Sequence, residues 1–208
     1  MVLKKLKIIK HTPFIWQYLN VASEEEVRII QDTCLKHLHQ HSIINERSRN
    51  SIHNHSSYNI FDIAKWHPDL ISRDKITQMS KLIHEVYTRA QFSYAQENEM
   101  FQYAMSATDL RVVGCEFPHY HFRNYEVGEE YGYHVDMHKD KRLILSALLY
   151  LNHDYDGGST QFLMDDVEVK PYRGSILVSP CGPYFIHKSF PITKGTKNII
   201  WACYNRSS

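Results

Sequence analysis

The pattern of apolar and polar positions predicts a helical first half of the chain and a strand-rich second half. Ser23-Glu-Glu-Glu26 has the form of a capping box, with acidic residues placed where the positive end of a helix dipole lies. Apolar residues then recur at helical spacing, which predicts a helix over about 23–40. These residues are Val27, Ile30, Cys34 and Leu38.

A second amphipathic stretch predicts another helix, opening at Pro68-Asp69 and running to about Gln96. Its apolar face consists of Ile76, Met79, Ile83, Val86 and Ala90. Between the two helices, the polar stretch from His41 to about Asn59 follows neither period. It is long enough to predict a mobile loop.

From Leu110 onward, short β-rich runs alternate with turn signals, which predicts a sandwich or barrel. The run Leu143–Leu151 does not alternate, so both of its faces should be covered, one by the barrel interior and one by the N-terminal helices. The predicted strands are 110–116, 120–125, 131–136, 143–151, 159–163, 167–170, 175–179, 184–189 and 198–204.

The chain reads as one mainly β domain over residues 1–208, because no repeat or linker divides it. Residues 1–105 form a helical support region in this interpretation, and residues 106–208 form the β core. The polar 41–59 stretch is the candidate substrate lid. Its polar and aromatic side chains include Arg47, Arg49, His53 and Tyr58.

Composition limits the partners of this domain. The 24 Lys and Arg residues against 23 Asp and Glu leave a net charge of +1, which argues against a protein that binds nucleic acid through its phosphates. The 4 cysteines form no C-x-x-C pair and are typical of buried thiols in a reducing compartment. Neither a signal-peptide core nor a membrane span is evident, so we expect a cytoplasmic protein without membrane partners.

His134-Val-Asp136 is a candidate metal-binding pair, since residues two apart on a strand face the same side. Two further H-x-D triplets occur, but His67-Pro-Asp69 lies at a predicted helix start and His138-Lys-Asp140 in a polar turn. A later histidine from a neighbouring strand would complete a facial triad suited to Fe(II).

The surroundings of this pair resemble the prolyl 4-hydroxylase-like 2-oxoglutarate/Fe(II) dioxygenases over about residues 110–204. Tyr125 to Asp136 is similar to the family's Y-x-x-G-x-x-Y-x-x-H-x-D strand pair. Tyr155 to Phe162 looks like its G-G-E-T-x-F turn, with Ser159 where Glu is usual. Pro171 to Val178 resembles its P-x-x-G strand, and His187, Pro191 and Lys197 match its distal histidine, proline and basic residue.

The resemblance implies a double-stranded β-helix (jelly roll) and assigns site residues. His134, Asp136 and His187 would bind Fe(II), Lys197 would pair with the distal carboxylate of 2-oxoglutarate, and Tyr125 would donate a second hydrogen bond to it. A buried carboxylate is costly without a cation, so such a partner is required. Lys194 is a rival cation with poorer spacing. Trp201 lies four residues after Lys197, where the family usually has six, which favours core packing or at most the site wall.

The implied reaction couples oxidative decarboxylation of 2-oxoglutarate by molecular oxygen, giving succinate and carbon dioxide, to hydroxylation of a substrate C–H bond. Ascorbate is the expected reductant. A prolyl residue in a peptide or protein is the favoured substrate. Free amino acids, small molecules, alkylated nucleic acid, and a non-catalytic jelly-roll binding module remain the alternatives.

Overall fold

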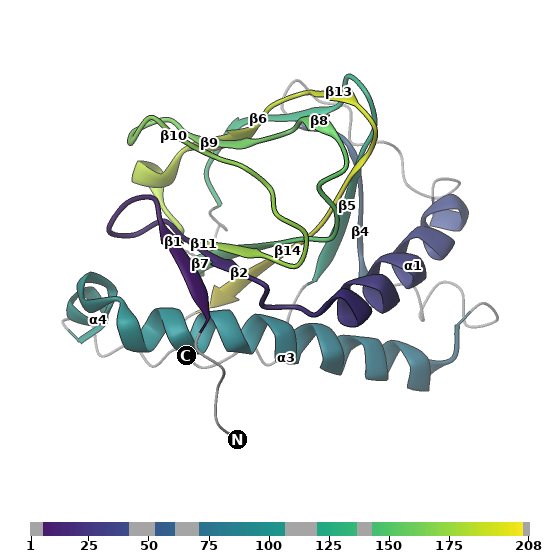
Figure 1. The fold of residues 1–208 in the computed structure, drawn as a ribbon, viewed down its shortest axis with the longest axis horizontal. Helices are drawn as coiled ribbons and strands as arrows, with labels where there is room; N and C mark the ends of the chain where they lie inside the picture. The colour runs from purple at the N-terminus through teal and green to yellow at the C-terminus, as the bar shows by residue number, and fades with distance from the viewer. Residues whose placement is uncertain (1–5, 42–52, 61–70, 107–119, 137–142, 206–208) are drawn as a thin grey trace.

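The computed structural model describes residues 6–41, 53–60, 71–106, 120–136 and 143–205. Two sheets curve toward each other around an interior, and helices α1 and α3 run along the outer side of the larger sheet (Figure 1). This arrangement confirms the predicted class, a mainly β jelly-roll core with N-terminal helices. The helices are α1 (Glu24–His41), α3 (Arg73–Glu97), α4 (Glu99–Ser106) and the 3₁₀ turn η1 (Pro183–Phe185).

The larger sheet has seven strands in the order β1-β2-β11-β7-β14-β5-β4. These strands are β1 (Lys7–Lys10), β2 (Trp16–Leu19), β11 (Ile176–Pro180), β7 (Leu143–Tyr150), β14 (Lys197–Asn205), β5 (His121–Tyr125) and β4 (Ser56–Asn59).

The smaller sheet has five strands in the order β10-β9-β12-β6-β3, and a separate pair, β13-β8, lies beside it. The five are β10 (Val167–Val169), β9 (Thr160–Phe162), β12 (His187–Ser189), β6 (Glu130–His134) and β3 (His53–Asn54), and the pair is β13 (Ile192–Lys194) with β8 (Asp156–Gly157). All pairings within these sheets are antiparallel.

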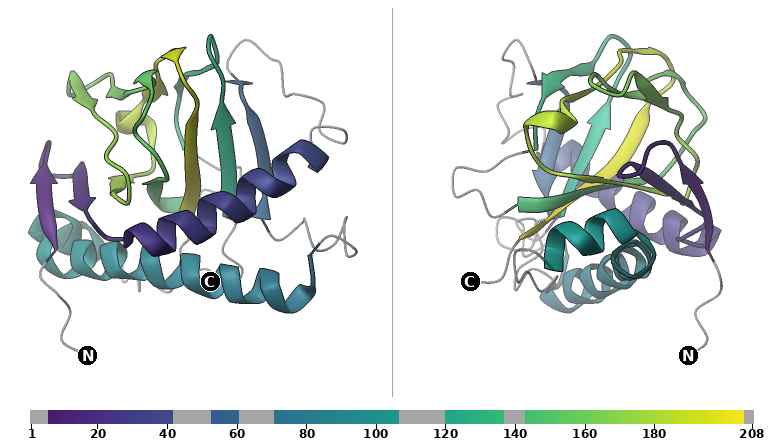
Figure 2. Two further views of the ribbon diagram at one scale, coloured as in Figure 1. Left: turned by 45° about the vertical axis from the view of Figure 1, so that its right-hand side comes forward. Right: turned by 90° about the vertical axis from the view of Figure 1, so that its left-hand side faces the viewer.

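Strand β7 lies at the centre of the larger sheet and is covered on both faces, as its unbroken apolar run predicted. Leu145 and Leu149 pack into the cluster between sheet and helices, whereas Leu148 and Tyr150 belong to the cluster inside the barrel. Tyr87 of α3 fixes the helix to the sheet, since its hydroxyl donates to the Ile200 carbonyl at 2.5 Å. The two views in Figure 2 show α1 and α3 together beneath this sheet.

The predicted capping box at the start of α1 is confirmed. The Glu26 amide donates to Ser23 Oγ at 3.2 Å, and the Ser23 amide donates to Glu26 Oε2 at 2.7 Å. The same carboxylate pairs with Arg89 of α3 at 2.7 Å, and Arg89 also donates to the Val21 carbonyl at 3.0 Å. Glu26 therefore joins the helix cap to the second helix.

The N-terminal half contains more strand than its sequence pattern predicted. Strands β1, β2 and β4 extend both edges of the larger sheet, and β3 joins the smaller one. Residues 53–59 are therefore not the loop that was expected, and Tyr58 is a buried core residue whose hydroxyl donates to the Cys34 carbonyl. The rest of the proposed lid, with Arg47 and Arg49, lies outside the described residues.

Other boundaries also differ. Helix α3 begins at Arg73, with Ser72 as its N-cap, rather than at Pro68-Asp69. The strand predicted over 184–189 is η1 followed by β12, because a glycine and a proline at 182–183 open a turn there. The strand predicted over 110–116 lies outside the described residues. No helix within the described ranges is long and apolar enough to cross a membrane.

Glu26→Gln should lower the free energy of unfolding by about 1–3 kcal/mol at pH 7, because it removes a charge-assisted link between two helices. Hydrogen bonding to Arg89 lowers the pKa of Glu26 from 4.5 to about 2. A depressed pKa stabilises the fold above the unfolded value, so the difference between wild type and variant should shrink as pH falls from 4.5 toward 2.

Chemical denaturation at several pH values measures this difference. Glu25→Gln is the matched control, because the Glu25–Arg28 pair is exposed and should contribute little. Equal effects of the two substitutions, or an effect of Glu26→Gln that persists at pH 2, would contradict the assignment.

Candidate active site

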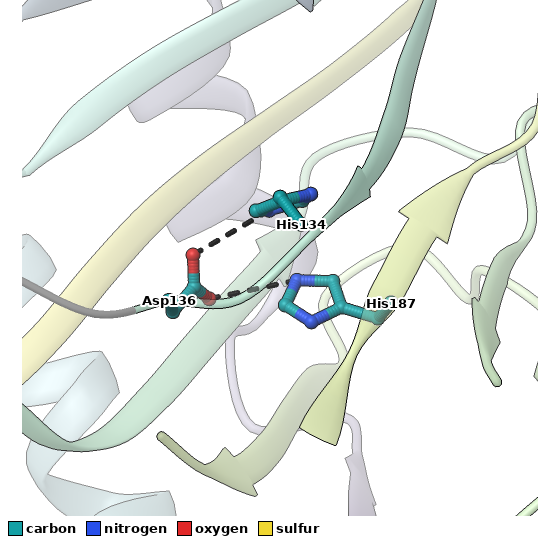
Figure 3. Close-up of side chains that lie close together, drawn as sticks. All are labelled: His134, Asp136 and His187. Carbon is teal, nitrogen blue, oxygen red and sulfur yellow. Dashed lines mark ion pairs between the residues drawn. The ribbon is translucent and has the colours of Figure 1, made fainter. Parts of the chain in front are cut away.

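Three predicted ligands lie close together, with both imidazoles beside the carboxylate (Figure 3). His134, Asp136 and His187 each offer one ligand atom, and these atoms lie within 4.8 Å of one another. The pairing of β12 with β6 brings this about, because it sets His187 directly opposite His134. Asp136 lies two residues beyond His134, just after β6 ends.

Both imidazoles are held in the orientation that metal binding requires. The Nδ1 atom of His134 lies 2.9 Å from the Gly132 carbonyl, and that of His187 lies 2.9 Å from the Phe185 carbonyl. A carbonyl only accepts, so each Nδ1 carries the proton and each Nε2 presents a lone pair. These Nε2 atoms point at the Asp136 carboxylate, each 3.5 Å from one of its oxygens.

Such a cluster of acceptors suits a cation. His134 Nε2 is buried and has no hydrogen-bond partner among the described residues. Two neutral imidazoles and one carboxylate are the donor set of non-haem Fe(II) sites, and the Nδ1 bonds supply the outer support typical of ligating histidines. The residues therefore fit a divalent metal.

Asp136 is anchored by the opposite sheet. Its Oδ2 accepts from Ser146 Oγ of β7 at 2.5 Å and from the Trp201 indole of β14 at 3.3 Å. Burial raises the pKa of Asp136, but the neighbouring imidazoles of His134 and His187 and the charge of Arg123 outweigh it and hold the pKa below its usual range. Burial lowers the pKa of His187, which keeps that imidazole neutral.

Lys197 is a buried cation with only neutral partners. Its side chain is 1% exposed, and its Nζ donates to the Gly158 carbonyl at 2.5 Å and to Ser189 Oγ at 2.7 Å. Burial lowers the pKa of Lys197 to about 7, and the charge of Arg123 adds to this effect. No carboxylate of the described residues lies at ion-pair distance from Lys197, so the ammonium lacks a counter-ion.

The turn that contains Gly158 helps to position Lys197. Gly158 has a φ of +64°, and a Cβ there would lie 2.4 Å from Ile192 Cδ1 and 3.2 Å from Lys197 Cδ. Only glycine therefore lets the chain pass close enough for its carbonyl to accept from Lys197. Ser159, where Glu is usual, donates instead to Glu168 at 2.7 Å.

Tyr125 lies directly opposite Lys197 in the pairing of β5 with β14. Burial raises the pKa of Tyr125 to about 12, so its hydroxyl keeps its proton and can donate. Its ring stacks on His55 with centroids 4.6 Å apart. Tyr131 stacks on the His134 ring with centroids 3.7 Å apart and steadies that ligand.

Arg123 is a second cation in this interior. Two residues before Tyr125 on β5, it faces the same side, and its guanidinium carbon lies 4.7 Å from the Trp201 ring centroid and 5.1 Å from that of Tyr131. Its Nε is buried without a hydrogen-bond partner among the described residues.

A small pocket that is partly open to solvent joins these groups. Its lining includes His134, His187, Tyr125, Arg123 and Lys197. Metal ligands and buried cations therefore share one cavity.

The structure brings together all five residues that the sequence selected: His134, Asp136, His187, Lys197 and Tyr125. The rival cation Lys194 is exposed on β13 and outside the pocket lining. Sequence reasoning missed Ser146 and Arg123, and it gave Trp201 no contact with a ligand. Two signals could have found them: Ser146 is the one serine in an otherwise apolar and aromatic strand, and Arg123 shares the period-2 face of Tyr125.

Comparison with known proteins agrees with this geometry. Residues 120–205 match the family model described as the 2OG-Fe(II) oxygenase superfamily. A PKHD-type hydroxylase of Pseudoalteromonas atlantica is 34% identical over 96 residues, covering 38% of this chain and 40% of that protein. The chain thus spans two fifths or less of the length of the curated relatives it matches.

Solved structures share the fold. A Pseudomonas putida prolyl-4-hydroxylase superposes with a TM-score of 0.60 at 21% identity, covering 93% of each chain. A Trichoplax adhaerens prolyl hydroxylase, solved with a hypoxia inducible factor peptide fragment, gives a TM-score of 0.66 at 16% identity and covers 93% of this chain and 84% of that one.

The matched segment contains every candidate metal ligand and Lys197, and the family together with the triad supports Fe(II) and 2-oxoglutarate as cofactors. The resemblance inferred from the motifs is confirmed, because residues 120–205 match the 2OG-Fe(II) oxygenase superfamily and are similar to a PKHD-type hydroxylase.

Proposed function

We propose that this protein is an Fe(II)- and 2-oxoglutarate-dependent dioxygenase that hydroxylates a C–H bond of a prolyl residue in a peptide or protein, releasing succinate and carbon dioxide. One observation carries the proposal: a buried lysine, which has no counter-ion among the described residues, lines the same pocket as two of the three candidate metal ligands. A metal site alone would leave Lys197 unexplained.

Each part of the pocket has a distinct task in this proposal. His134, Asp136 and His187 hold the metal, which supplies oxygen activation when bound. Lys197 neutralises the distal carboxylate of 2-oxoglutarate, which would otherwise be costly to bury. Tyr125 donates a further hydrogen bond, and the aromatic walls exclude water.

The non-catalytic alternative accounts less well for these residues. A binding module has no use for a buried cation, and the hydrogen bonds to Gly158 and Ser189 do not replace the lost hydration of a full charge. A buried charge of this kind is typical of a site where a bound ligand compensates its desolvation.

The prolyl substrate rests on the relatives and on the chain's charge. Its hydroxylase relatives include prolyl hydroxylases, one of them solved with a peptide fragment. A net charge of +1 provides no excess for following a phosphate backbone. Proline suits an oxygenase pocket because its fixed φ reduces the entropy lost on binding. Free thiols at Cys34, Cys181 and Cys203 favour a reducing, cytoplasmic setting.

Alanine at His134, Asp136 or His187 should weaken metal binding by more than about 100-fold, since loss of outer-shell support alone costs 10–100-fold. Titration with Mn(II) or Zn(II), followed by calorimetry, gives the affinity and the expected stoichiometry of one ion per chain. His153→Ala is the control, because that imidazole accepts from the Arg173 amide instead. Undiminished metal binding in the triad variants would exclude the assignment.

Lys197→Met should weaken 2-oxoglutarate binding about tenfold to a hundredfold while leaving metal affinity intact. It should also stabilise the fold by roughly 1–3 kcal/mol at pH 6, because a desolvated charge is removed. Burial lowers the pKa of Lys197 to about 7 from 10.5, so below pH 7 the charge is present in both states and the folded state bears the full cost. As pH rises from 7 toward 10.5 the unfolded state holds more protons, and the advantage of the variant should shrink.

Calorimetry with 2-oxoglutarate and denaturation at pH 6 and 9 measure the two effects. The exposed Lys194→Met serves as control and should change neither. Unchanged cofactor affinity in Lys197→Met would transfer the role to another cation.

Succinate release should be stimulated by proline-containing peptides and not by free proline, methylated oligonucleotides, or the same peptides with alanine in place of proline. Mass spectrometry of the peptides should find one added oxygen on proline. Stimulation by a free amino acid alone would refute the prolyl substrate and leave the oxygenase assignment standing.

A further inference from the structure

We propose that Arg123 and Lys197 form a two-cation clamp that binds both carboxylates of a short dicarboxylate, with Arg123 holding the carboxylate nearest the metal. The inference rests on the proposed function for the identity of the dicarboxylate. It adds a binding role for Arg123. A protein side chain would then bind the oxo acid at each of its two carboxylates.

The positions of the two cations on neighbouring strands fit this role. Lys197 pairs with Tyr125, and Arg123 lies two residues from Tyr125 on the same face of β5. The offset along the strand is about 6.8 Å, at 3.4 Å per residue. An extended five-carbon diacid spans roughly 5 Å between its carboxyl carbons, given C–C bonds of 1.52 Å and angles near 111°. The span of such a diacid and the offset of the two strand positions are therefore of similar size.

Arg123 is placed at the metal end of the pocket. Its guanidinium lies against Trp201, whose indole donates to Asp136, and against Tyr131, whose ring stacks on His134. One aromatic ring thus separates the guanidinium from each of two metal ligands. A carboxylate at the metal would lie within reach of its fork of donors.

Arg123 also has unused binding capacity. Its guanidinium has Tyr125 as a hydrogen-bond partner, but its Nε is buried without one among the described residues, and none of their carboxylates lies at ion-pair distance. Burial opposes the charge of Arg123, but Tyr125, Tyr131 and Asp136 outweigh it and raise its pKa, so the charge persists. A permanent cation held between aromatic rings, with an unsatisfied donor, is ready for a planar anion.

Calorimetry on the Zn(II)-loaded protein tests the clamp with two probes, 2-oxoglutarate and 2-oxopentanoate, which lacks the distal carboxylate. Arg123→Met should lower the affinity for both acids by tenfold or more, because both have the carboxylate that would lie at the metal. Lys197→Met should lower the affinity for 2-oxoglutarate by a similar factor and leave the affinity for 2-oxopentanoate within about twofold of wild type. Only 2-oxoglutarate has the distal carboxylate that Lys197 binds. Lys194→Met, exposed on β13, should change neither affinity.

A second arm uses metal-free protein and succinate. The wild type should bind succinate, and either Arg123→Met or Lys197→Met should remove that binding. If the metal-free wild type binds no dicarboxylate, the metal rather than Arg123 holds the second carboxylate, and the clamp is refuted.

The outcomes separate this inference from the proposed function. If the Zn(II)-loaded wild type fails to bind 2-oxoglutarate, the proposed function itself fails. If the wild type binds 2-oxoglutarate and Arg123→Met binds it equally well, only the clamp fails. Zn(II) affinity and circular dichroism check that Arg123→Met is folded. Should it not fold, Arg123→Gln removes the charge but keeps a polar side chain, and an affinity equal to wild type in that variant would likewise refute the clamp.

Discussion

Asp136 is the point at which the two sheets of the barrel are bound into one site. It follows directly from β6 of the smaller sheet, yet its carboxylate accepts hydrogen bonds from Ser146 and Trp201 of the larger sheet. The two histidines come from paired strands of the smaller sheet, and their Nε2 atoms converge on the same carboxylate. The geometry of the site therefore depends on how the sheets are held apart, which is set by the packing inside the barrel rather than by any one strand.

The charges of the pocket explain why such a site is costly to fold. Asp136 is negative and has two neutral imidazoles beside it, while Lys197 and Arg123 are positive and have no acidic partner at ion-pair distance in the described part of the chain. Part of the hydrophobic stabilisation of the inner cluster must offset the desolvation of these groups. A divalent metal and a dicarboxylate would balance them, since an added +2 and −2 leave the sum unchanged but place each charge beside its opposite. Bound cofactors should accordingly stabilise the fold by linkage.

The sequence predicted the parts of the site that lie in local patterns and missed those that depend on register. His134, Asp136 and Tyr125 stand in one spaced motif, and His187 and Lys197 in another, so all five were identified without a structure. The partnership of Ser146 and Trp201 with Asp136 depends on the pairing of β7 with β14, which no spacing within one strand reveals. Likewise, β1 to β4 are only two to four residues long, too short for an alternating pattern to be recognised, and tertiary pairing with the core sheet makes them strands. The start of α3 was misplaced because Pro68-Asp69 imitates a helix start, whereas Ser72 is the cap.

Trp201 shows why the departure from the family's usual spacing need not impair the site. Residues on β14 that differ by two point to the same side, so positions four and six beyond Lys197 both face the barrel interior. A tryptophan at position four lies one strand step nearer to Lys197, about 6.8 Å along the strand. From there its indole reaches Asp136 while its ring supports the Arg123 guanidinium. The position of Trp201 and the presence of Arg123 on the neighbouring strand β5 are therefore linked. The ring that orients Asp136 also supports the second cation of the pocket.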